Sequence, residues 1–212
     1  GLGIGAGIIG RSRGQKVVLD RDWVLESFAF QRRELRYQQL EGSFSQPNGG
    51  VNRQMLGWAA AQAAALGGDL LELYCGNGNF TVALAPLFRR VLATEVSKSS
   101  VQAARYNLAA NGIANTALAR LSSDEISAAL AGRESFARLR DIDLAAYEFS
   151  TLFVDPPRSG LDAATVDLAR SRRSVDRALR GFTDTAARLE GTVLRGSVAG
   201  ALDAAASLAA LR

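Results

Sequence analysis

Two short segments near the middle of the sequence carry residue types that suit a nucleoside-containing cofactor. Gly76 and Gly78 directly follow an apolar run, and glycines at the end of a strand leave the backbone bare, so that a ligand can approach closely. Glu95 ends the next apolar run, seventeen residues beyond Gly78, where its carboxylate could accept two hydrogen bonds from ribose hydroxyls. These features suit a dinucleotide or S-adenosylmethionine. The turn is shorter than the dinucleotide pattern and lacks its third glycine, which favours S-adenosylmethionine.

A further segment, Asp155-Pro156-Pro157-Arg158, follows a later apolar run. Consecutive prolines fix a rigid turn, which would present an acid and an arginine at the same end of the sheet as Gly76. In nucleic-acid methyltransferases, the strand that ends in such a turn lies where the target base and the cofactor meet. The segment therefore favours methyl transfer to a nucleic acid over dinucleotide chemistry.

The composition excludes several other chemistries. The 212 residues include no histidine and a single cysteine, which rules out a Ser-His-Asp triad, a histidine metal ligand, an internal disulfide and a cysteine zinc cluster. No Walker lysine follows the glycine turn, so a triphosphate cradle is not expected. The apolar runs are well short of the ~20 residues that cross a bilayer, and the first residues do not form an export signal. We therefore expect a cytoplasmic protein without a membrane or metal partner.

Residues 5–10 also spell the dinucleotide fingerprint G-x-G-x-x-G. That fingerprint binds phosphate only between a strand and a helix, where amides at the helix start point at the ligand. No strand pattern precedes it here, and residues 11–16 do not open a helix. We therefore exclude residues 5–10 as a phosphate site.

The elements that must position the candidate residues alternate along the chain. Apolar residues at helical spacing predict helices, and short apolar runs predict strands. Such alternation through short loops indicates an α/β fold with a mostly parallel sheet and right-handed crossovers. Nearer the amino terminus, residues 16–20 and 35–40 are expected to form short strands of a separate module. In the main part we expect helices over residues 52–66, 80–87 and 99–111, and strands over residues 69–75, 90–95, 117–121 and 150–154.

Four colinear segments resemble the tRNA (uracil-5-)-methyltransferase family: residues 43–56 (SFSQPNGGVNRQML), 69–85 (DLLELYCGNGNFTVALA), 90–113 (RVLATEVSKSSVQAARYNLAANGI) and 153–162 (FVDPPRSGLD). The resemblance implies a Rossmann-like class I methyltransferase fold, with a sheet that is incomplete at its carboxyl-terminal edge. It also implies methylation of uridine carbon 5 in the T-loop of tRNA, with S-adenosylmethionine as cofactor. Ribosomal RNA uracil-5-methyltransferases share the fold, so ribosomal RNA is the alternative substrate.

The resemblance also implies which residues contact the cofactor. Glu95 would hold the ribose, the region of Tyr74 and Asn79 would face the methionine half, and Gln46 would supply an amide donor and acceptor. Asp124, which follows the third expected strand of the sheet, would meet the adenine amino group. The expected cofactor contacts are Gln46, Tyr74, Asn79, Glu95 and Asp155.

The resemblance and the charge distribution together predict three parts. Residues 1–40, with seven basic and four acidic side chains, would be the remnant of an amino-terminal RNA-binding module. Residues 41–170, with eleven basic and thirteen acidic side chains, would form the S-adenosylmethionine-binding core. Residues 171–212 follow as a divergent tail, again more basic than acidic, whose structure the sequence does not indicate. Basic flanks suit phosphate contacts, although arginine-rich stretches are equally typical of plain solvated faces.

The family's reaction needs two groups that the sequence does not supply. Carbon 5 of uracil is a poor nucleophile, so a cysteine thiolate adds to carbon 6, and a carboxylate later removes the proton from carbon 5. In the family both groups lie beyond the DPPRSGLD segment, but the sequence after Arg170 has no cysteine, and its one glutamate, Glu190, matches no family motif. Cys75 is expected to be a buried small side chain. We therefore assign no catalytic residue and expect the chain to be catalytically incomplete.

Two other functions stay open at this point. An inactive cofactor- or RNA-binding protein would fit the absent nucleophile and the basic flanks. An amino-directed methyltransferase would need no thiol, but such enzymes usually place an aromatic side chain after the prolines, where Arg158 lies in this sequence.

Overall fold

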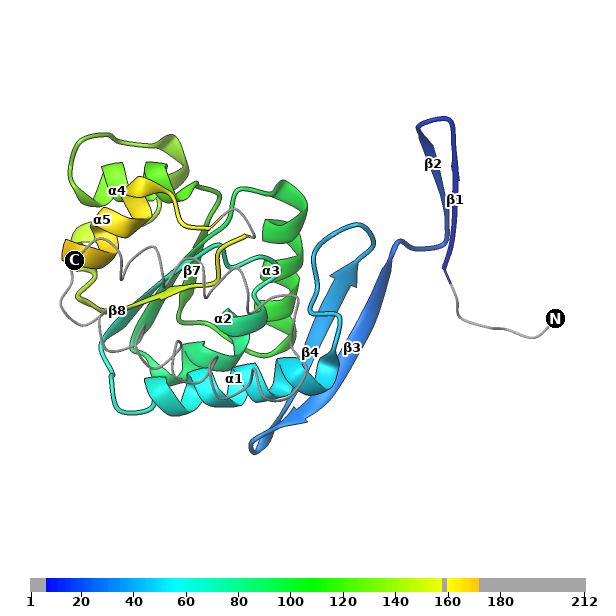
Figure 1. The fold of residues 1–212 in the computed structure, drawn as a ribbon, viewed down its shortest axis with the longest axis horizontal. Coiled ribbons are helices and arrows are strands. Elements are labelled where there is room, and N and C mark those ends of the chain that lie inside the picture. The colour runs from blue at the N-terminus through cyan, green and yellow to red at the C-terminus, as the bar shows by residue number, and fades with distance from the viewer. Residues whose placement is uncertain (1–6, 158–159, 172–212) are drawn as a thin grey trace.

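The computed structural model describes residues 7–157 and 160–171, which are built around a four-stranded parallel sheet (Figure 1). Because every strand runs in the same direction, all four carboxyl ends lie at one edge of the sheet. This arrangement confirms the predicted α/β fold class. The strands, in the spatial order β7-β6-β5-β8, are β7 (Thr116–Ala119), β6 (Arg90–Thr94), β5 (Asp69–Leu73) and β8 (Phe149–Val154).

The sheet separates two hydrophobic clusters, and the sequence of β5 explains why. All five residues of β5 are buried, as expected for a parallel strand that is covered on both faces. Side chains alternate between the two faces of a strand. Leu70 accordingly packs with Leu56 of α1 on one face, whereas Leu71 packs with Ile126 of α4 on the other.

Three of the described helices, α1, α3 and α4, begin at residues whose side chains cap them. The described part of the chain contains five α-helices: α1 (Gly49–Ala63), α2 (Asn79–Leu84), α3 (Lys98–Ala110), α4 (Ser123–Leu130) and α5 (Ala163–Ser171), with 3₁₀ turns at Ala85–Leu87, Ala137–Leu139 and Leu144–Ala146. The side chains of Asn48, Ser97 and Ser122 each accept a hydrogen bond from the backbone N–H three residues later. The Asn48 cap starts α1 three residues before the predicted helix over 52–66. Within the described residues, no helix combines the length and the apolar character needed to span a bilayer.

Strand β5 ends earlier than predicted. The expected strand over 69–75 stops at Leu73, because Tyr74 adopts a φ of 57°, in the left-handed region. That conformation costs a residue other than glycine roughly 1–2 kcal/mol, and a tyrosine in the sequence does not signal it. The bend at Tyr74 therefore takes the chain out of the sheet and into the glycine turn two residues early.

Two antiparallel hairpins precede the sheet. Strand β1 (Ile8–Ser12) pairs with β2 (Gln15–Leu19), and β3 (Trp23–Phe30) pairs with β4 (Arg33–Leu40). The predicted strands over 16–20 and 35–40 are confirmed as β2 and β4, whereas their partners were not predicted. The described part of residues 5–10 enters a strand rather than a helix, as expected. In Figure 1 the β1–β2 hairpin projects from the molecule, whereas β4 lies beside α3.

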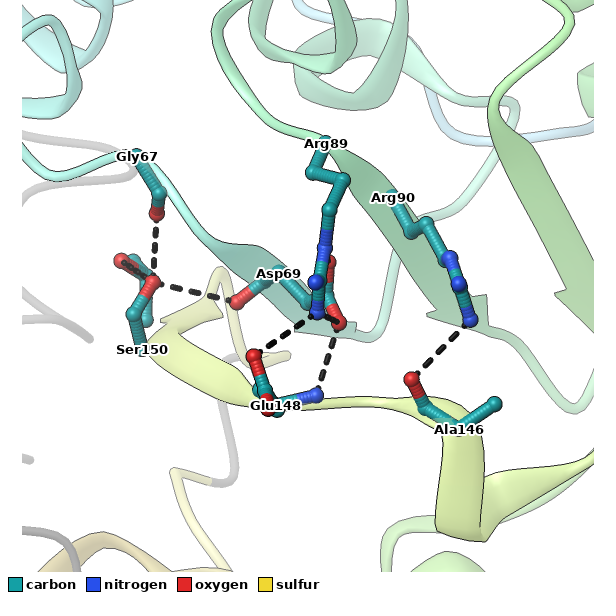
Figure 2. A network of polar contacts seen from close by, with 8 residues as sticks. Gly67, Asp69, Arg89, Arg90, Ala146, Glu148 and Ser150 are labelled. Atoms are coloured by element: carbon teal, nitrogen blue, oxygen red, sulfur yellow. Dashed lines mark hydrogen bonds and ion pairs between the residues drawn. The ribbon is translucent and has the colours of Figure 1, made fainter.

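A buried carboxylate fixes the amino-terminal edge of the sheet (Figure 2). Asp69, at the start of β5, is fully buried and accepts hydrogen bonds from Arg89 Nε at 2.9 Å, from Arg89 Nη2 at 2.8 Å and from the Glu148 backbone N–H at 2.7 Å. The Arg89 bonds hold the pKa of Asp69 below its ordinary value, against the opposing effect of burial. Glu148 directly precedes β8, so this contact aligns the starts of β5 and β8.

Parts of the earlier expectations fall outside the described residues. Residues 172–212, which make up nearly all of the expected divergent tail, and Arg158 of the double-proline segment are among them. Within the described residues, β8 is the outer strand on its side of the sheet.

Candidate cofactor-binding site

Three strand ends meet where the strand order of the sheet reverses. From β5 the chain continues to β6 and β7 on one side, and β8 then returns to the other side of β5. Leu73 lies opposite Val154, and Glu72 lies opposite Ala93, so the residues after β5, β6 and β8 lie next to one another. In open α/β sheets, ligands bind outside the carboxyl ends at such a reversal. Tyr74, Glu95 and Asp155 all follow these ends.

The glycine turn needs its glycines for their backbone conformation. Gly76 and Gly78 have φ values of 57° and 82°, which glycine adopts without strain. The Gly78 N–H donates to the Cys75 carbonyl oxygen at 2.8 Å, which closes the turn, and Gly78 then precedes the first residue of α2. A Cβ at Gly76 would meet nothing within 4 Å. The backbone of the turn is therefore open to a ligand at Gly76.

Glu95 is held against this turn by both of its carboxylate oxygens. Its Oε2 accepts a hydrogen bond from the Gly76 backbone N–H at 3.0 Å, and its Oε1 accepts one from the Ser97 backbone N–H at 2.8 Å. Each carboxylate oxygen can accept a second hydrogen bond. The two N–H groups therefore orient a carboxylate that still has acceptor capacity for a pair of hydroxyls.

Asp155 and Glu72 place two desolvated carboxyl groups beside the turn. Burial raises the pKa of Asp155 to about 6. Burial also raises the pKa of Glu72 to about 8, and the charge of Asp155 adds to the rise. Glu72 is a β5 residue with 1% exposure, and within the described part of the chain its Oε2 has no hydrogen-bond partner. Glu72 was not predicted as a site residue, although a glutamate between the leucines of β5 is a signal that could have revealed it.

Tyr74 lies at the site but directs its hydroxyl elsewhere. The hydroxyl oxygen is 2.7 Å from Asp162 Oδ2 and 2.8 Å from Ser123 Oγ, and Ser123 also hydrogen-bonds to Asp162. Asp162 in turn caps α5 by accepting from the Thr165 backbone N–H at 2.7 Å. Tyr74 therefore links the end of β5 to the starts of α4 and α5, and only its backbone and ring remain for a ligand at the turn.

The Asn79 side chain is paired with a buried residue of α1. Asn52 and Asn79 exchange two amide hydrogen bonds, at 3.0 and 2.8 Å, and Asn52 is 4% exposed. This pair joins the first turn of α1 to the glycine turn. Asn52 was not predicted as a site residue. Its position among the apolar residues of α1, which suggests burial, was the signal that could have revealed it.

Gln46 and Asp124 are not bonded to the glycine turn. Gln46 is half-buried in the segment between β4 and α1, and Asp124 is exposed in the first turn of α4. Among the described residues, neither side chain hydrogen-bonds to Glu95 or to residues 76–79. Their expected contacts to the cofactor therefore stay predictions.

Cys75 has the character of a structural side chain. It is 6% exposed, and burial raises the pKa of its thiol well above the ordinary value. A thiol under these conditions is protonated at neutral pH and is a poor nucleophile. The geometry agrees with the expected buried role of the only cysteine in the sequence.

The sequence of the chain resembles those of known proteins. A sequence model described as tRNA (Uracil-5-)-methyltransferase matches residues 2–176. The chain is 73% identical over 167 residues to the tRNA/tmRNA (uracil-C(5))-methyltransferase of Dechloromonas aromatica, covering 79% of this chain and 46% of that protein. It is 75% identical over 163 residues to the protein of the same name from Aromatoleum aromaticum, covering 77% and 44%. The chain thus spans a little under half the length of these relatives.

Two solved structures share the fold. One is the Pyrococcus abyssi tRNA (uracil-54, C5)-methyltransferase in complex with S-adenosyl-L-homocysteine, with a TM-score of 0.52, 21% identity, and coverage of 77% of this chain and 38% of that chain. The other is the T. thermophilus 16S rRNA N2 G1207 methyltransferase (RsmC) in complex with AdoMet and guanosine, with a TM-score of 0.51, 20% identity, and coverage of 79% and 47%. At these identities the likeness concerns the fold alone. The length and identity of the sequence matches carry the further conclusion that the chain belongs to the tRNA (uracil-5-)-methyltransferase family.

Proposed function

We propose that this chain is the S-adenosylmethionine-binding part of a tRNA (uracil-5-)-methyltransferase. The observation that supports the proposal most is the Glu95 carboxylate, which is held beside Gly76 at the edge where β5, β6 and β8 end. A fixed carboxylate next to a bare backbone turn has the acceptors that an adenosyl ribose requires. The sequence relatives, at 73% and 75% identity, are methyltransferases of uracil carbon 5 by name.

Different residues at this edge contact different parts of the cofactor in our proposal. Glu95 accepts hydrogen bonds from the ribose hydroxyls, and the open backbone at Gly76 lies against the methionine half. Asp155 lies at the neighbouring strand end, where an ionised carboxylate attracts a sulfonium cation. Gln46, Tyr74 and Asn79 complete the set in our proposal. When bound, the cofactor supplies a methyl group on a positively charged sulfur.

The RNA partner in this proposal is tRNA, and ribosomal RNA is the alternative. Residues 1–40 carry a net positive charge, and Arg32 and Arg36 are exposed on the β3–β4 hairpin, where they can meet phosphates. We therefore keep residues 1–40 as part of an RNA-binding module, residues 41–170 as the cofactor-binding core and residues 171–212 as a divergent tail. A cytoplasmic location is part of the same proposal, since tRNA is the substrate.

A second candidate function follows from the state of Cys75. Methyl transfer to carbon 5 by the covalent route needs a thiolate, and the only cysteine of this sequence is buried with a raised pKa. We propose that this chain by itself binds cofactor and RNA without completing methyl transfer. Incubation with labelled S-adenosylmethionine and unmodified tRNA tests this directly, and label at uracil carbon 5 would contradict it.

The cofactor proposal is tested by calorimetric titration with S-adenosylhomocysteine. In Glu95→Gln, an amide N–H₂ group replaces one carboxylate oxygen. It cannot accept the hydrogen bond that this oxygen accepts from a backbone N–H of Gly76 or Ser97. Loss of charge-assisted bonds of this kind weakens binding about 10- to 100-fold. Glu34→Gln, an exposed residue of the β3–β4 hairpin, is the matched control and should bind like the natural chain. Absence of S-adenosylhomocysteine binding by the natural chain, or unchanged binding by Glu95→Gln, would refute the proposal.

A further inference from the structure

Strand β4 is held on both of its edges, and one of the partners is a helix. Its inner edge pairs with β3 in the hairpin. On the other edge, the Asn111 side chain of the α3 C-terminus accepts from the Arg36 N–H at 3.0 Å and donates to the Arg36 carbonyl at 2.7 Å, while Asn107 Oδ1 accepts from the Gln38 N–H at 2.6 Å. Four residues of a helix rise about 6 Å, and two residues of a strand advance about 6.7 Å. The two asparagines therefore match alternate residues of β4 and take the place of a neighbouring strand.

One of these asparagines, Asn107, also contacts the glycine turn. Asn107 is fully buried, and its Nδ2 donates to the Asn77 backbone carbonyl at 2.9 Å. The Asn77 side chain donates to Gln39 Oε1 of β4 at 2.8 Å, and Gln39 Nε2 donates to Glu26 Oε2 of β3 at 2.9 Å. The central residue of the turn is thus bonded through its backbone to α3 and through its side chain to the hairpin.

A second contact from the hairpin lies on the other side of Gly78. The buried Tyr37 of β4 stacks on Phe28 of β3, with ring centroids 5.6 Å apart, and its hydroxyl donates to the Asn79 carbonyl at 3.0 Å. The hairpin therefore hydrogen-bonds to the residues before and after Gly78. Gly76 and Gly78 have no side chains of their own with which to fix the turn, so these outside contacts limit its conformations.

We propose that Gln39, supported by Glu26, is a positioning residue that holds the Gly76–Asn79 turn in its ligand-binding conformation, which makes the β3–β4 hairpin part of the cofactor site. Ordering a backbone costs free energy for each residue, and a turn that is ordered in advance spares the ligand that cost. By reciprocity of coupled equilibria, a molecule that stabilises the hairpin strengthens cofactor binding, and the cofactor stabilises the hairpin. The inference rests on the proposed function only in the identity of the ligand.

The test compares Gln39→Leu with a double variant that exchanges the two partners, Glu26→Gln with Gln39→Glu. In the double variant, a carboxylate at position 39 accepts from Asn77 Nδ2 and from the new amide at position 26, so the relay and the total charge are retained. Glu34→Gln, on the same hairpin but outside the relay, is the control. Hydrogen–deuterium exchange of the Gly76 and Gly78 amides in the free protein reports on the turn, with β6 amides as the internal reference, and calorimetry with S-adenosylhomocysteine reports on the ligand.

We expect Gln39→Leu to speed exchange of the two turn amides about 3- to 10-fold, the range that corresponds to the loss of the one hydrogen bond between Gln39 and Asn77, and to weaken S-adenosylhomocysteine binding by a similar factor. The double variant should restore both, and the β6 amides should not change. Unchanged exchange in the turn, or faster exchange with unchanged affinity, overturns the inference. If the turn responds as expected but even the natural chain binds no S-adenosylhomocysteine, the hold of the hairpin on the turn stands and the proposed function fails.

Discussion

The buried carboxyl of Glu72 gives a prediction whose size can be worked out from the structure. Its ordinary pKa is 4.5, and burial raises the pKa in the folded chain to about 8. Between these two values the folded chain keeps a proton that the unfolded chain has lost. Stability therefore falls as pH rises, by about 1.4 kcal/mol for each pH unit. Below pH 4.5 this penalty is absent, and above pH 8 it stops growing.

The expected magnitude is large for a domain of this kind. From pH 6 to pH 8 the free energy of unfolding should fall by about 2 kcal/mol through Glu72, because the slope lessens as pH approaches the folded pKa; a typical domain is stabilised by roughly 5–15 kcal/mol. The pKa of Asp155 is raised to about 6, so ionisation of Asp155 also lowers the free energy of unfolding as pH rises, but mainly below pH 6. The interval from pH 6 to pH 8 therefore isolates Glu72.

Glu72→Gln tests this reasoning, because glutamine is close in shape and does not ionise. Urea unfolding followed by tryptophan fluorescence should show that the free energy of unfolding of the natural chain falls between pH 6 and pH 8. In Glu72→Gln the free energy of unfolding should not fall over this interval. The exposed variant Glu34→Gln should keep the decline of the natural chain. Parallel pH profiles for the natural chain and Glu72→Gln would mean that Glu72 is already ionised in the folded protein, and the reasoning would be wrong.

Three further expectations follow from the strand ends and the turn. Arg89→Ala should lower the free energy of unfolding by about 3 kcal/mol, because it leaves the buried Asp69 carboxylate with one hydrogen bond. Arg140→Ala, which removes an exposed ion pair with Asp141, should lower it by under about 1 kcal/mol. Urea unfolding at pH 7 distinguishes the two effects. Gly78→Ala should destabilise by roughly 1–2 kcal/mol through its φ of 82° alone, since the added Cβ would lie 3.5 Å from its nearest neighbour; a melting temperature equal to that of the natural chain would contradict this. Affinity for S-adenosylmethionine should rise as pH increases through about 6, when Asp155 ionises, and Asp155→Asn should remove that rise in calorimetric titrations at pH 5, 6 and 7.

Much of the sheet could be predicted because its signals are local. Apolar runs ended by polar or glycine residues marked β5, β6, β7 and β8, and parallel topology followed from their alternation with helices. The prediction was wrong at the end of β5, because Tyr74 has a left-handed backbone that a tyrosine in the sequence does not signal, and its hydroxyl bonds to Asp162, 88 residues later. Strands β1 and β3 were also missed, since a hairpin strand is stabilised mainly by the partner it pairs with.

The sequence by itself determined the residue types at the candidate site. Two glycines after one strand and acids at the ends of two others define what the edge can bind, because each strand delivers its next residue to the same edge. Only the tertiary structure decided how those residues are supported. The relay from Glu26 through Gln39 to Asn77, and the burial of Glu72 near Asp155, join positions that are tens of residues apart. Hydrogen bonds and desolvation act through space, so no pattern along the chain encodes them.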